Sequence, residues 1–484
     1  MLSSLSNVSI NLFYLACFFI TGIGLASAWL ISWPVIFILV YLALVLWLLD
    51  RRSKGAIFLI GLSLGAAYLN YQIERRQLIE EAWQQEDRVV LIGTVITSPE
   101  IRPTGSYLKL KVDWAVQAQS ELRGHVAVLG DYSWSEFLPG QKLMIMGQPS
   151  LSDDFQEYRL KSGLYATFFH PRLKPVGHPS IYQVTTLMAR LQKRASAIIK
   201  SRLVEPASSL LEAMLLGREI SKSSLAEDLS RTGLNHIAVV SGMHLVVLTG
   251  LLRGILNGIG LNYRRSAIVI LIIILFFILL TGGRPAIWRA GLMVGFGLLG
   301  SLLGRIYQPE RAIIWAAVIL LLINPMFLRW DIGFQLSFLA AAGLIGWTDR
   351  IKRWLEWIPG VFLQEALAVT LAAQLATVPL VAYYFQQISL VGPLANVLIV
   401  AFLPLVFGLG LIFVCLVGCS PISWLMGLTL TLLTEMIFFF SSLKWATITV
   451  VVPIWLVATY YLAWALLTWS KAKKASTFHV ERLC

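Results

Sequence analysis

Two histidines and a serine lie within nine residues of an otherwise apolar segment. Residues 236–244 read His-Ile-Ala-Val-Val-Ser-Gly-Met-His. Hydrocarbon offers no hydrogen bonds, so such side chains are costly in a bilayer unless they face a partner, a cavity or a path. In a helix, Ser241 and His244 can meet on one face, which permits nucleophilic chemistry. His236 and His244 would lie about 12 Å apart along the helix axis, too far to share one metal ion.

The first interpretation of this segment is a set of groups that line a path or pack helices. Structural hydrogen bonding is one alternative, and catalysis by Ser241 and His244 is another, although no carboxylate stands near in sequence to orient the histidine. Gly242 either lets a second helix approach closely or breaks the helix within the membrane.

Polar residues interrupt three other apolar stretches. Arg284 and Arg289 flank a proline at a predicted helix start, where they snorkel to the interface or meet phosphates. Asp331 opens a further span and is suited to cap it. The segments around Gln374 and Asn396 are rich in proline, which is typical of kinked or broken helices. The candidates for lining or gating a path are therefore His236, Ser241, Gly242, His244, Arg284, Arg289, Asp331, Gln335, Ser337, Gln374 and Asn396.

The composition is that of a polytopic α-helical membrane protein. Of 484 residues, 57% are hydrophobic and 13% charged, about half the charged fraction of a typical soluble domain. Stretches of about twenty apolar residues predict about twelve spans. They cover roughly 10–29, 32–49, 56–73, 236–253, 266–281, 287–304, 311–327, 332–347, 364–385, 390–416, 421–440 and 449–469.

Lysine and arginine clusters in the short loops set the expected orientation. If the spans alternate, the clusters at 51–54, 264–265, 350–353 and 471–474 all fall on one side. Cytoplasmic loops carry such an excess, so we expect a cytoplasmic N-terminus and attribute the net charge of +13 mainly to these loops. Residues 74–183 are then extracytoplasmic. The expected regions are 1–73 (three spans), 74–183 (β domain), 184–235 (amphipathic, interfacial), 236–470 (channel domain) and 471–484 (basic cytoplasmic tail).

The polar region has the pattern of a small β-barrel. Residues 89–96, 107–114, 125–129 and 142–146 alternate or are β-branched, and glycine punctuates them, which predicts an all-β fold such as an OB-fold. Such barrels stack bases of a single strand on aromatic rings. Tyr107, Trp114, Tyr132 and Trp134 are candidates for that contact. From Arg75 to Gln183 the region holds equal numbers of acidic and basic residues, so aromatic core packing in a scaffold domain is an equal alternative.

Residues 184–204 predict a basic amphipathic helix. Leu187, Leu191, Ala195 and Ile198 share one face and five basic residues lie elsewhere. The helix is expected to lie at the membrane interface or to line an entrance that attracts polyanions. Cys415 and Cys419 are four residues apart with no third ligand nearby, so we predict no metal and no cofactor. The sequence has no Walker motif, so ATP hydrolysis by this chain is not expected.

Four segments together resemble the ComEC family of DNA-uptake channels. They are Gly233-Leu-Asn-His-Ile-Ala-Val-Val-Ser-Gly-Met-His244, Arg289-Ala-Gly-Leu-Met293, Asp331-Ile-Gly-Phe-Gln-Leu-Ser-Phe338, and Ala373-Gln-Leu-Ala-Thr-Val-Pro379 with Asn396. The resemblance implies an inner-membrane channel that passes single-stranded DNA into the cytoplasm during natural transformation. The implied partners are single-stranded DNA, membrane lipids, an external DNA receptor, and a cytoplasmic helicase or ATPase motor.

One departure limits what the resemblance implies. Many members of that family continue into a metallo-β-lactamase-like domain, whose His-x-His-x-Asp-His type of metal motif this sequence lacks. We therefore expect either a truncated or short form, or degradation of the other strand by a separate protein, and no catalytic residue in this chain. The rival functions are an intramembrane hydrolase or acyltransferase that uses Ser241 and His244, and a small-solute transporter. We find no internal repeat of the kind that transporters usually carry.

Overall fold

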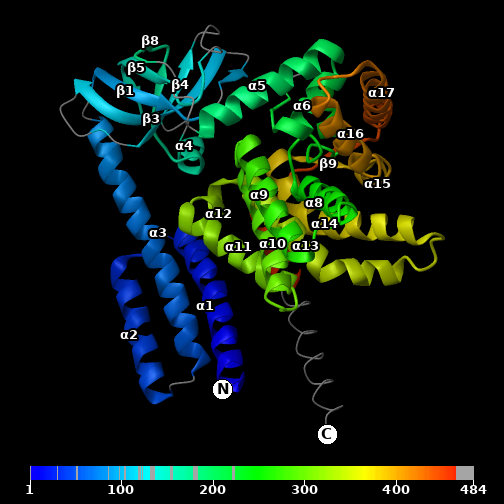
Figure 1. The fold of residues 1–484 in the computed structure, drawn as a ribbon. Coiled ribbons are helices and arrows are strands. Elements are labelled where there is room, and N and C mark those ends of the chain that lie inside the picture. Colours follow the sequence, from blue (N-terminus) through cyan, green and yellow to red (C-terminus); the bar gives the residue numbers. More distant parts are fainter. Residues whose placement is uncertain are drawn as a thin grey trace.

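The structure is a computed structural model that describes residues 2–29, 31–50, 53–84, 87–97, 99–102, 105–117, 122, 124–130, 137–152, 156–177, 184–220 and 224–464. It is mostly helical, with one β domain set beside the helical bundle (Figure 1). The chain is a multi-pass membrane protein, as its composition predicts.

Within the described ranges, six helices are long and apolar enough to cross a membrane. They are α1 (Leu2–Trp29), α3 (Lys54–Gln84), α9 (Tyr263–Leu280), α10 (Pro285–Leu302), α14 (Val361–Phe385) and α17 (Ser420–Ser442). A seventh span results if α15 (Gly392–Val400) and α16 (Leu403–Cys415), which meet at a bend of 45°, are counted together. Each predicted apolar stretch overlaps a helix, but the count of twelve spans is not confirmed.

The remaining helices are shorter or more polar. They are α2 (Trp33–Leu49), α4 (Gln156–Ser162), α5 (Val184–Arg202), α6 (Ala207–Leu216), α7 (Ser224–Arg231), α8 (Gly242–Gly258), α11 (Pro309–Ile323), α12 (Phe327–Trp330) and α13 (Ile332–Trp354), with a last helix at Ile454–Trp464.

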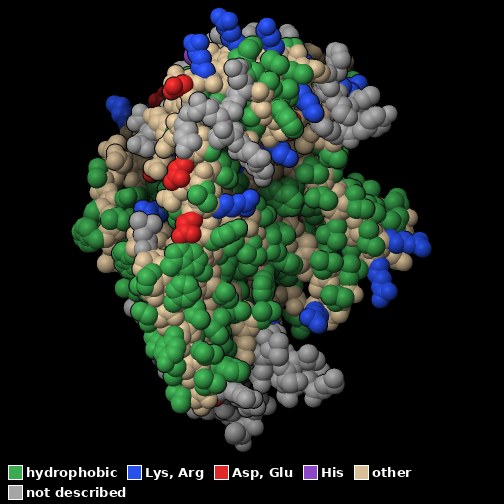
Figure 2. All heavy atoms as spheres, turned by 90° about the vertical axis from the view of Figure 1, so that its left-hand side faces the viewer, with side chains coloured by type: hydrophobic (Ala, Val, Ile, Leu, Met, Phe, Trp, Pro, Cys, Tyr) green, Lys and Arg blue, Asp and Glu red, His purple; other side chains and the backbone are tan. Residues whose placement is uncertain are grey.

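The N-terminal helices pack through small residues. Gly61 and Gly65 lie one turn apart on α3 and face α1, and a side chain at Gly65 would overlap the carbonyl oxygen of Phe19. Such glycines let membrane helices approach closely. Figure 2 shows apolar side chains over the lower part of the molecule and Lys and Arg side chains gathered at its top, over the β domain. The apolar surface of α2, which includes Phe37, Ile38 and Tyr41, is suited to lipid.

The four predicted strands are confirmed, and further strands extend them. The strands are β1 (Val89–Val95), β2 (Glu100–Arg102), β3 (Gly105–Gln117), β4 (His125–Gly130), β5 (Lys142–Gly147), β6 (Pro149–Ser150), β7 (Leu164–Phe169) and β8 (Arg172–Pro175), and a separate pair is formed by β9 (Gln387–Ser389) and β10 (Thr447–Thr449).

The large sheet closes into a small barrel. β1 pairs with β3 and β5, β3 with β4, and β4 with β7 in parallel. β6 follows β5 after one residue and pairs with β7, so the pairings return to where they began. The core includes Leu91, Leu108, Val128, Ile145 and Phe168, which are fully buried.

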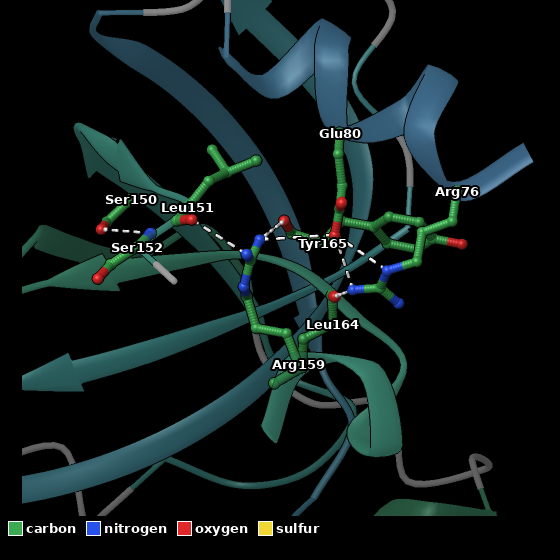
Figure 3. Close-up of polar contacts among 8 residues, drawn as sticks. All are labelled: Arg76, Glu80, Ser150, Leu151, Ser152, Arg159, Leu164 and Tyr165. Carbon is green, nitrogen blue, oxygen red and sulfur yellow. Dashed lines mark hydrogen bonds and ion pairs between the residues drawn. The ribbon is translucent and has the colours of Figure 1, made fainter. Parts of the chain in front are cut away.

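Helix α3 continues from the membrane segment into this barrel, at a joint that we call the neck: Arg76, Glu80, Trp83 and Arg159. Trp83 is 0% exposed and lies edge-on to Phe168, with ring centroids 6.0 Å apart. Arg76 donates to Glu80 Oε1 at 2.9 Å and to the carbonyl of Leu164. Figure 3 shows Arg159 on the other side of Glu80, 3.5 Å from Oε1.

Arg159 completes the neck with bonds to the main chain. It donates to the carbonyl oxygens of Tyr165 at 3.1 Å and Leu151 at 3.0 Å (Figure 3). Two guanidinium groups thus share one carboxylate and bond the backbone of two segments, β7 and the residue after β6. Charge-assisted bonds of this kind are stronger than neutral ones.

Buried residues of α11 and α13 pack with α1 and α3 in one apolar core, and a second, larger core begins at Ala195. The larger core joins buried residues of α5, α6 and α7, such as Ile199, Leu211 and Leu229, to those of α8, α9 and α16. Helix α5 is confirmed as a helix, and its predicted apolar face is confirmed in part, since Ala195 is buried and Ile198 packs on the core. The structure buries Met188 and Ile199 and exposes Leu187, because α5 packs on α6 and α9 instead of lying free.

Candidate functional site

The segment that contains His236 is not helical, contrary to the predicted span 236–253. Helix α8 begins at Gly242, and the residues from Gly233 to Ser241 form turns and extended chain. Gly233 has φ +71°, in the left-handed region, and packs against Ser389. The helical spacing assumed between the two histidines therefore does not apply. Irregular backbone at membrane depth is tolerated where protein covers it or where it lines a wet cavity.

Ser241 and His244 do meet, and together they cap α8. The backbone N–H of Ser241 donates to His244 Nδ1 at 3.1 Å, and the Ser241 side chain accepts from the backbone N–H of His244. Ser241 Oγ is also 3.1 Å from Nδ1. Because Nδ1 accepts, a neutral ring carries its proton on Nε2. His244 is 1% exposed, and Nε2 has no hydrogen-bond partner in the described part of the chain.

His236 links the non-helical segment to two helices. Its Nε2 is 3.0 Å from Asn396 Oδ1 on α15, and Asn396 Nδ2 donates to Thr370 Oγ1 on α14 at 2.8 Å. Thr370 is a participant that sequence reasoning missed, because a lone threonine in a membrane helix usually bonds its own backbone. The three side chains form one hydrogen-bonded chain across the bundle.

Arg289 lies near the start of α10 and faces the start of α8. A side chain at Gly242 would come within 3.3 Å of Ala290 and 3.4 Å of Arg289 Nη2, so glycine permits this close approach. Arg289 Nε donates to Ser337 Oγ on α13 at 2.8 Å, and the guanidinium lies 5.8 Å from the centre of the Phe338 ring. No carboxylate pairs with Arg289 among the described residues.

These contacts define the polar cluster: His236, Ser241, His244, Arg289, Ser337, Thr370 and Asn396. His236 is exposed, Ser241, Arg289, Ser337 and Asn396 are half-buried, and only His244 and Thr370 are buried. The cluster therefore lies inside the bundle and is still reached by solvent through several of its members. Each of the four sequence clusters contributes at least one residue to it.

The other predicted residues have different surroundings. Arg284 forms an ion pair with Glu219 at 2.8 Å and is not a free cation. The predicted cap is confirmed, since Asp331 Oδ1 accepts from the N–H of Phe334 at 2.7 Å. Gln335 donates to the carbonyls of Leu328 and Arg329. Gln374 lines a hollow of about 310 Å³ beside Pro393 and Tyr460.

The aromatic candidates of the β domain differ in their exposure to solvent. Tyr107 is 4% exposed and packs with Ala127 and Leu164, so it has no free face for a base and is withdrawn. Trp114 is 69% exposed near the end of β3. Tyr132 and Trp134 lie outside the described residues.

Comparison with known proteins agrees with the position of this cluster. The model of a family described as "Competence protein" matches residues 214–474, which include every member of the polar cluster. The "ComE operon protein 3" of Bacillus subtilis (strain 168) is 28% identical over 250 residues, which is 51% of this chain and 31% of that protein. The chain thus aligns with about a third of that relative. No solved structure matches. Since the family model covers more than half of its length, the chain belongs to the competence protein family.

Proposed function

We propose that the protein is an inner-membrane channel that passes single-stranded DNA into the cytoplasm during natural transformation. The observation that carries the proposal is Arg289, a half-buried cation with no carboxylate partner in the described chain. Such a charge is costly in a membrane protein unless a counter-ion neutralises it. It therefore marks a functional site. A DNA strand brings one phosphate charge per nucleotide.

The groups around Arg289 suit an anion that passes. The N-terminus of α8 presents backbone N–H groups and the positive end of the helix dipole beside the guanidinium. The unpartnered Nε2 of His244 is a further donor, and in the proposed mechanism it meets a phosphate oxygen when the bundle opens. Membership of the competence protein family supports this reading.

The β domain is proposed to be an OB-like domain outside the cytoplasm. Its closed sheet, with β4 and β7 parallel, supports the OB-like assignment. The proposed partners are an external DNA receptor, a cytoplasmic helicase or ATPase motor and a separate nuclease. The proposed orientation has a cytoplasmic N-terminus.

Replacing Arg289 tests the channel. Arg289→Gln should lower import of labelled DNA about tenfold or more, equivalent to about 1.4 kcal/mol, while DNA bound outside the cell stays unchanged. Arg284→Gln is the matched control, because Arg284 is already paired with Glu219. Normal import by Arg289→Gln at normal protein levels would overturn the proposal.

The second candidate is an intramembrane hydrolase with Ser241 as nucleophile, favoured by the 3.1 Å contact between Ser241 Oγ and His244 Nδ1. The same atoms form the α8 cap, which is a sufficient structural reason for the pair. Ser241→Asn separates the two roles, because asparagine caps helices but is not a nucleophile. A capping role predicts that Ser241→Asn imports DNA better than Ser241→Ala, whereas a nucleophile predicts equal loss in both.

A further inference from the structure

Helix α5 carries a run of basic side chains that no acidic residue of the helix offsets. Its sequence contains neither Asp nor Glu. Arg190, Lys193, Arg194 and Lys200 fall within about 120° of the helix circumference, and we call them the basic edge. Lys193, Arg194 and Lys200 are exposed and Arg190 is half-buried.

Most of this charge is not neutralised. Lys200 Nζ lies 3.6 Å from Glu212 Oε2, but Arg218 approaches the other oxygen of the same carboxylate at 3.9 Å, so one acid serves two cations. No ion pair reaches Lys193 or Arg194 in the part of the chain that the structure describes. Unpaired cations side by side repel each other and favour an anionic partner.

Contacts near the start and in the middle of α5 hold it between the β domain and the bundle. At its start, Thr186 Oγ1 donates to the carbonyl of Pro139 at 2.7 Å, which belongs to the β domain. Further along, Gln192 donates to the carbonyls of Leu216 and Leu280 in the bundle. Figure 1 shows the helix extending from the β domain to α6. The basic edge thus occupies the connection between the two parts.

The neighbours of the basic edge favour a hydrophilic polyanion over a lipid surface. A helix that lies in a membrane interface needs bulky apolar side chains beside its cations. The exposed residues between the basic side chains are Ala197 and Ser201. Within α5, the exposed bulky apolar residues are Val184 and Leu187, and both lie at the end next to the β domain.

We propose that the basic edge binds the backbone phosphates of a single nucleic-acid strand on its way from the β domain to the polar cluster. The inference rests on the proposed function and adds a second contact surface, outside the polar cluster, to it. Phosphate contacts of this kind do not depend on base sequence and weaken with salt.

The test measures how salt weakens binding of a fluorescent oligo-dT strand. The full chain is placed in phosphatidylcholine nanodiscs, and fluorescence anisotropy gives the affinity at several NaCl concentrations. Lys193→Gln/Arg194→Gln should reduce the slope of log affinity against log salt by about 1.4, since each lost contact to a single strand removes about 0.7. Lys193→Arg/Arg194→Lys should keep the slope.

The matched control removes two exposed cations from the β domain instead. Arg172→Gln/Lys174→Gln lowers the net charge equally and should leave the slope unchanged. Equal slopes in wild type and Lys193→Gln/Arg194→Gln, or equal reductions in both double variants, would overturn the proposal. A third outcome would also overturn it: Lys193→Gln/Arg194→Gln leaves the slope unchanged but retains less phosphatidylglycerol, as measured by native mass spectrometry. That result would assign the basic edge to lipid binding. If the wild type binds no strand at all, the proposed function fails as well.

Discussion

The neck and the polar cluster both place arginines inside the protein, but they surround them differently. In the neck, Arg76 and Arg159 share Glu80, and each also bonds a main-chain carbonyl. In the polar cluster, Arg289 bonds one serine hydroxyl, contacts sulfur and an aromatic ring, and has no carboxylate partner in the described chain. Trp83 in the neck is fully buried, whereas most of the cluster is half-buried or exposed.

This difference indicates that the neck is a fixed joint and that the polar cluster is a site that can rearrange. Many charge-assisted bonds and a buried indole fix α3 to the barrel in one geometry, because breaking any one leaves a buried group unpaired. The polar cluster is held by single hydrogen bonds between elements, each of small net value in a membrane protein. We infer that the neck fixes the position of the β domain relative to α3. The polar cluster is then the part that can change its conformation.

The largest expected effect is the loss of Trp83. Trp83→Ala removes a fully buried side chain from the barrel core and should destabilise the β domain by about 3–5 kcal/mol. Pulse proteolysis of the full chain in urea measures this as a lower urea midpoint for cleavage in the β domain. Leu78→Ala on the same helix is the control, because Leu78 is 69% exposed. If both variants have the wild-type midpoint, the neck is not a joint.

The next effect is smaller and tests the electrostatic part of the neck. Arg159→Met keeps an apolar stem but leaves the carbonyls of Leu151 and Tyr165 without their donor, which should cost about 1.5–3 kcal/mol. The same pulse proteolysis reports it. Arg172→Met, which removes an exposed cation from β8, should change the midpoint little. A larger effect at Arg172 would contradict the role given to Arg159.

The polar cluster should respond in the opposite sense, with small stability changes and large functional ones. A double-mutant cycle of His236→Ala and Asn396→Ala should give a coupling energy of about 0.6 kcal/mol, as interhelical hydrogen bonds in membranes typically do. Unfolding in an SDS titration measures the coupling, and import of labelled DNA measures function. A coupling as large as that of the neck would mean that the cluster is a fixed joint too.

The sequence predicts the elements better than it predicts their contacts. Periodicity and β-branched runs locate the four main strands and an apolar helix at each expected stretch. It misses the start of α8, because hydropathy treats Ile237 and Val240 as part of a span. In the structure, Gly233 adopts a left-handed conformation and Ser241 caps the helix five residues after His236. Local turn and cap chemistry therefore overrides hydropathy.

Contacts between residues that are far apart in the chain cannot be predicted from local sequence patterns. The bond from His236 to Asn396 joins residues 160 positions apart, and the cluster requires Thr370, which has no distinctive pattern around it. Likewise, nothing in the sequence around Arg159 indicates that it pairs with Glu80 of α3. Tyr107 was a reasonable stacking candidate by residue type, yet its ring lies on the face of β3 opposite the barrel core and is covered by Tyr158 of α4. Tertiary packing decides all of these.

The smallest expected effect is a pH dependence of the β domain that originates at His125 on β4. Burial, together with the nearby charges of Lys109 and Lys111, lowers the pKa of His125 below 6.5. The unfolded chain then binds more protons near that pH, so the stability of the β domain is full above pH 6.5 and falls as the pH drops toward the folded pKa.

His125→Gln should flatten this dependence, and pulse proteolysis at pH 5.5 and 7.5 measures it. His170, which is exposed beyond β7, supplies the control His170→Gln, which should keep the wild-type dependence. Greater stability of the wild-type β domain at pH 5.5 than at pH 7.5 would contradict the assignment. Because His125 lies outside the neck and the polar cluster, its titration should change neither DNA binding at the basic edge nor the coupling of His236 to Asn396.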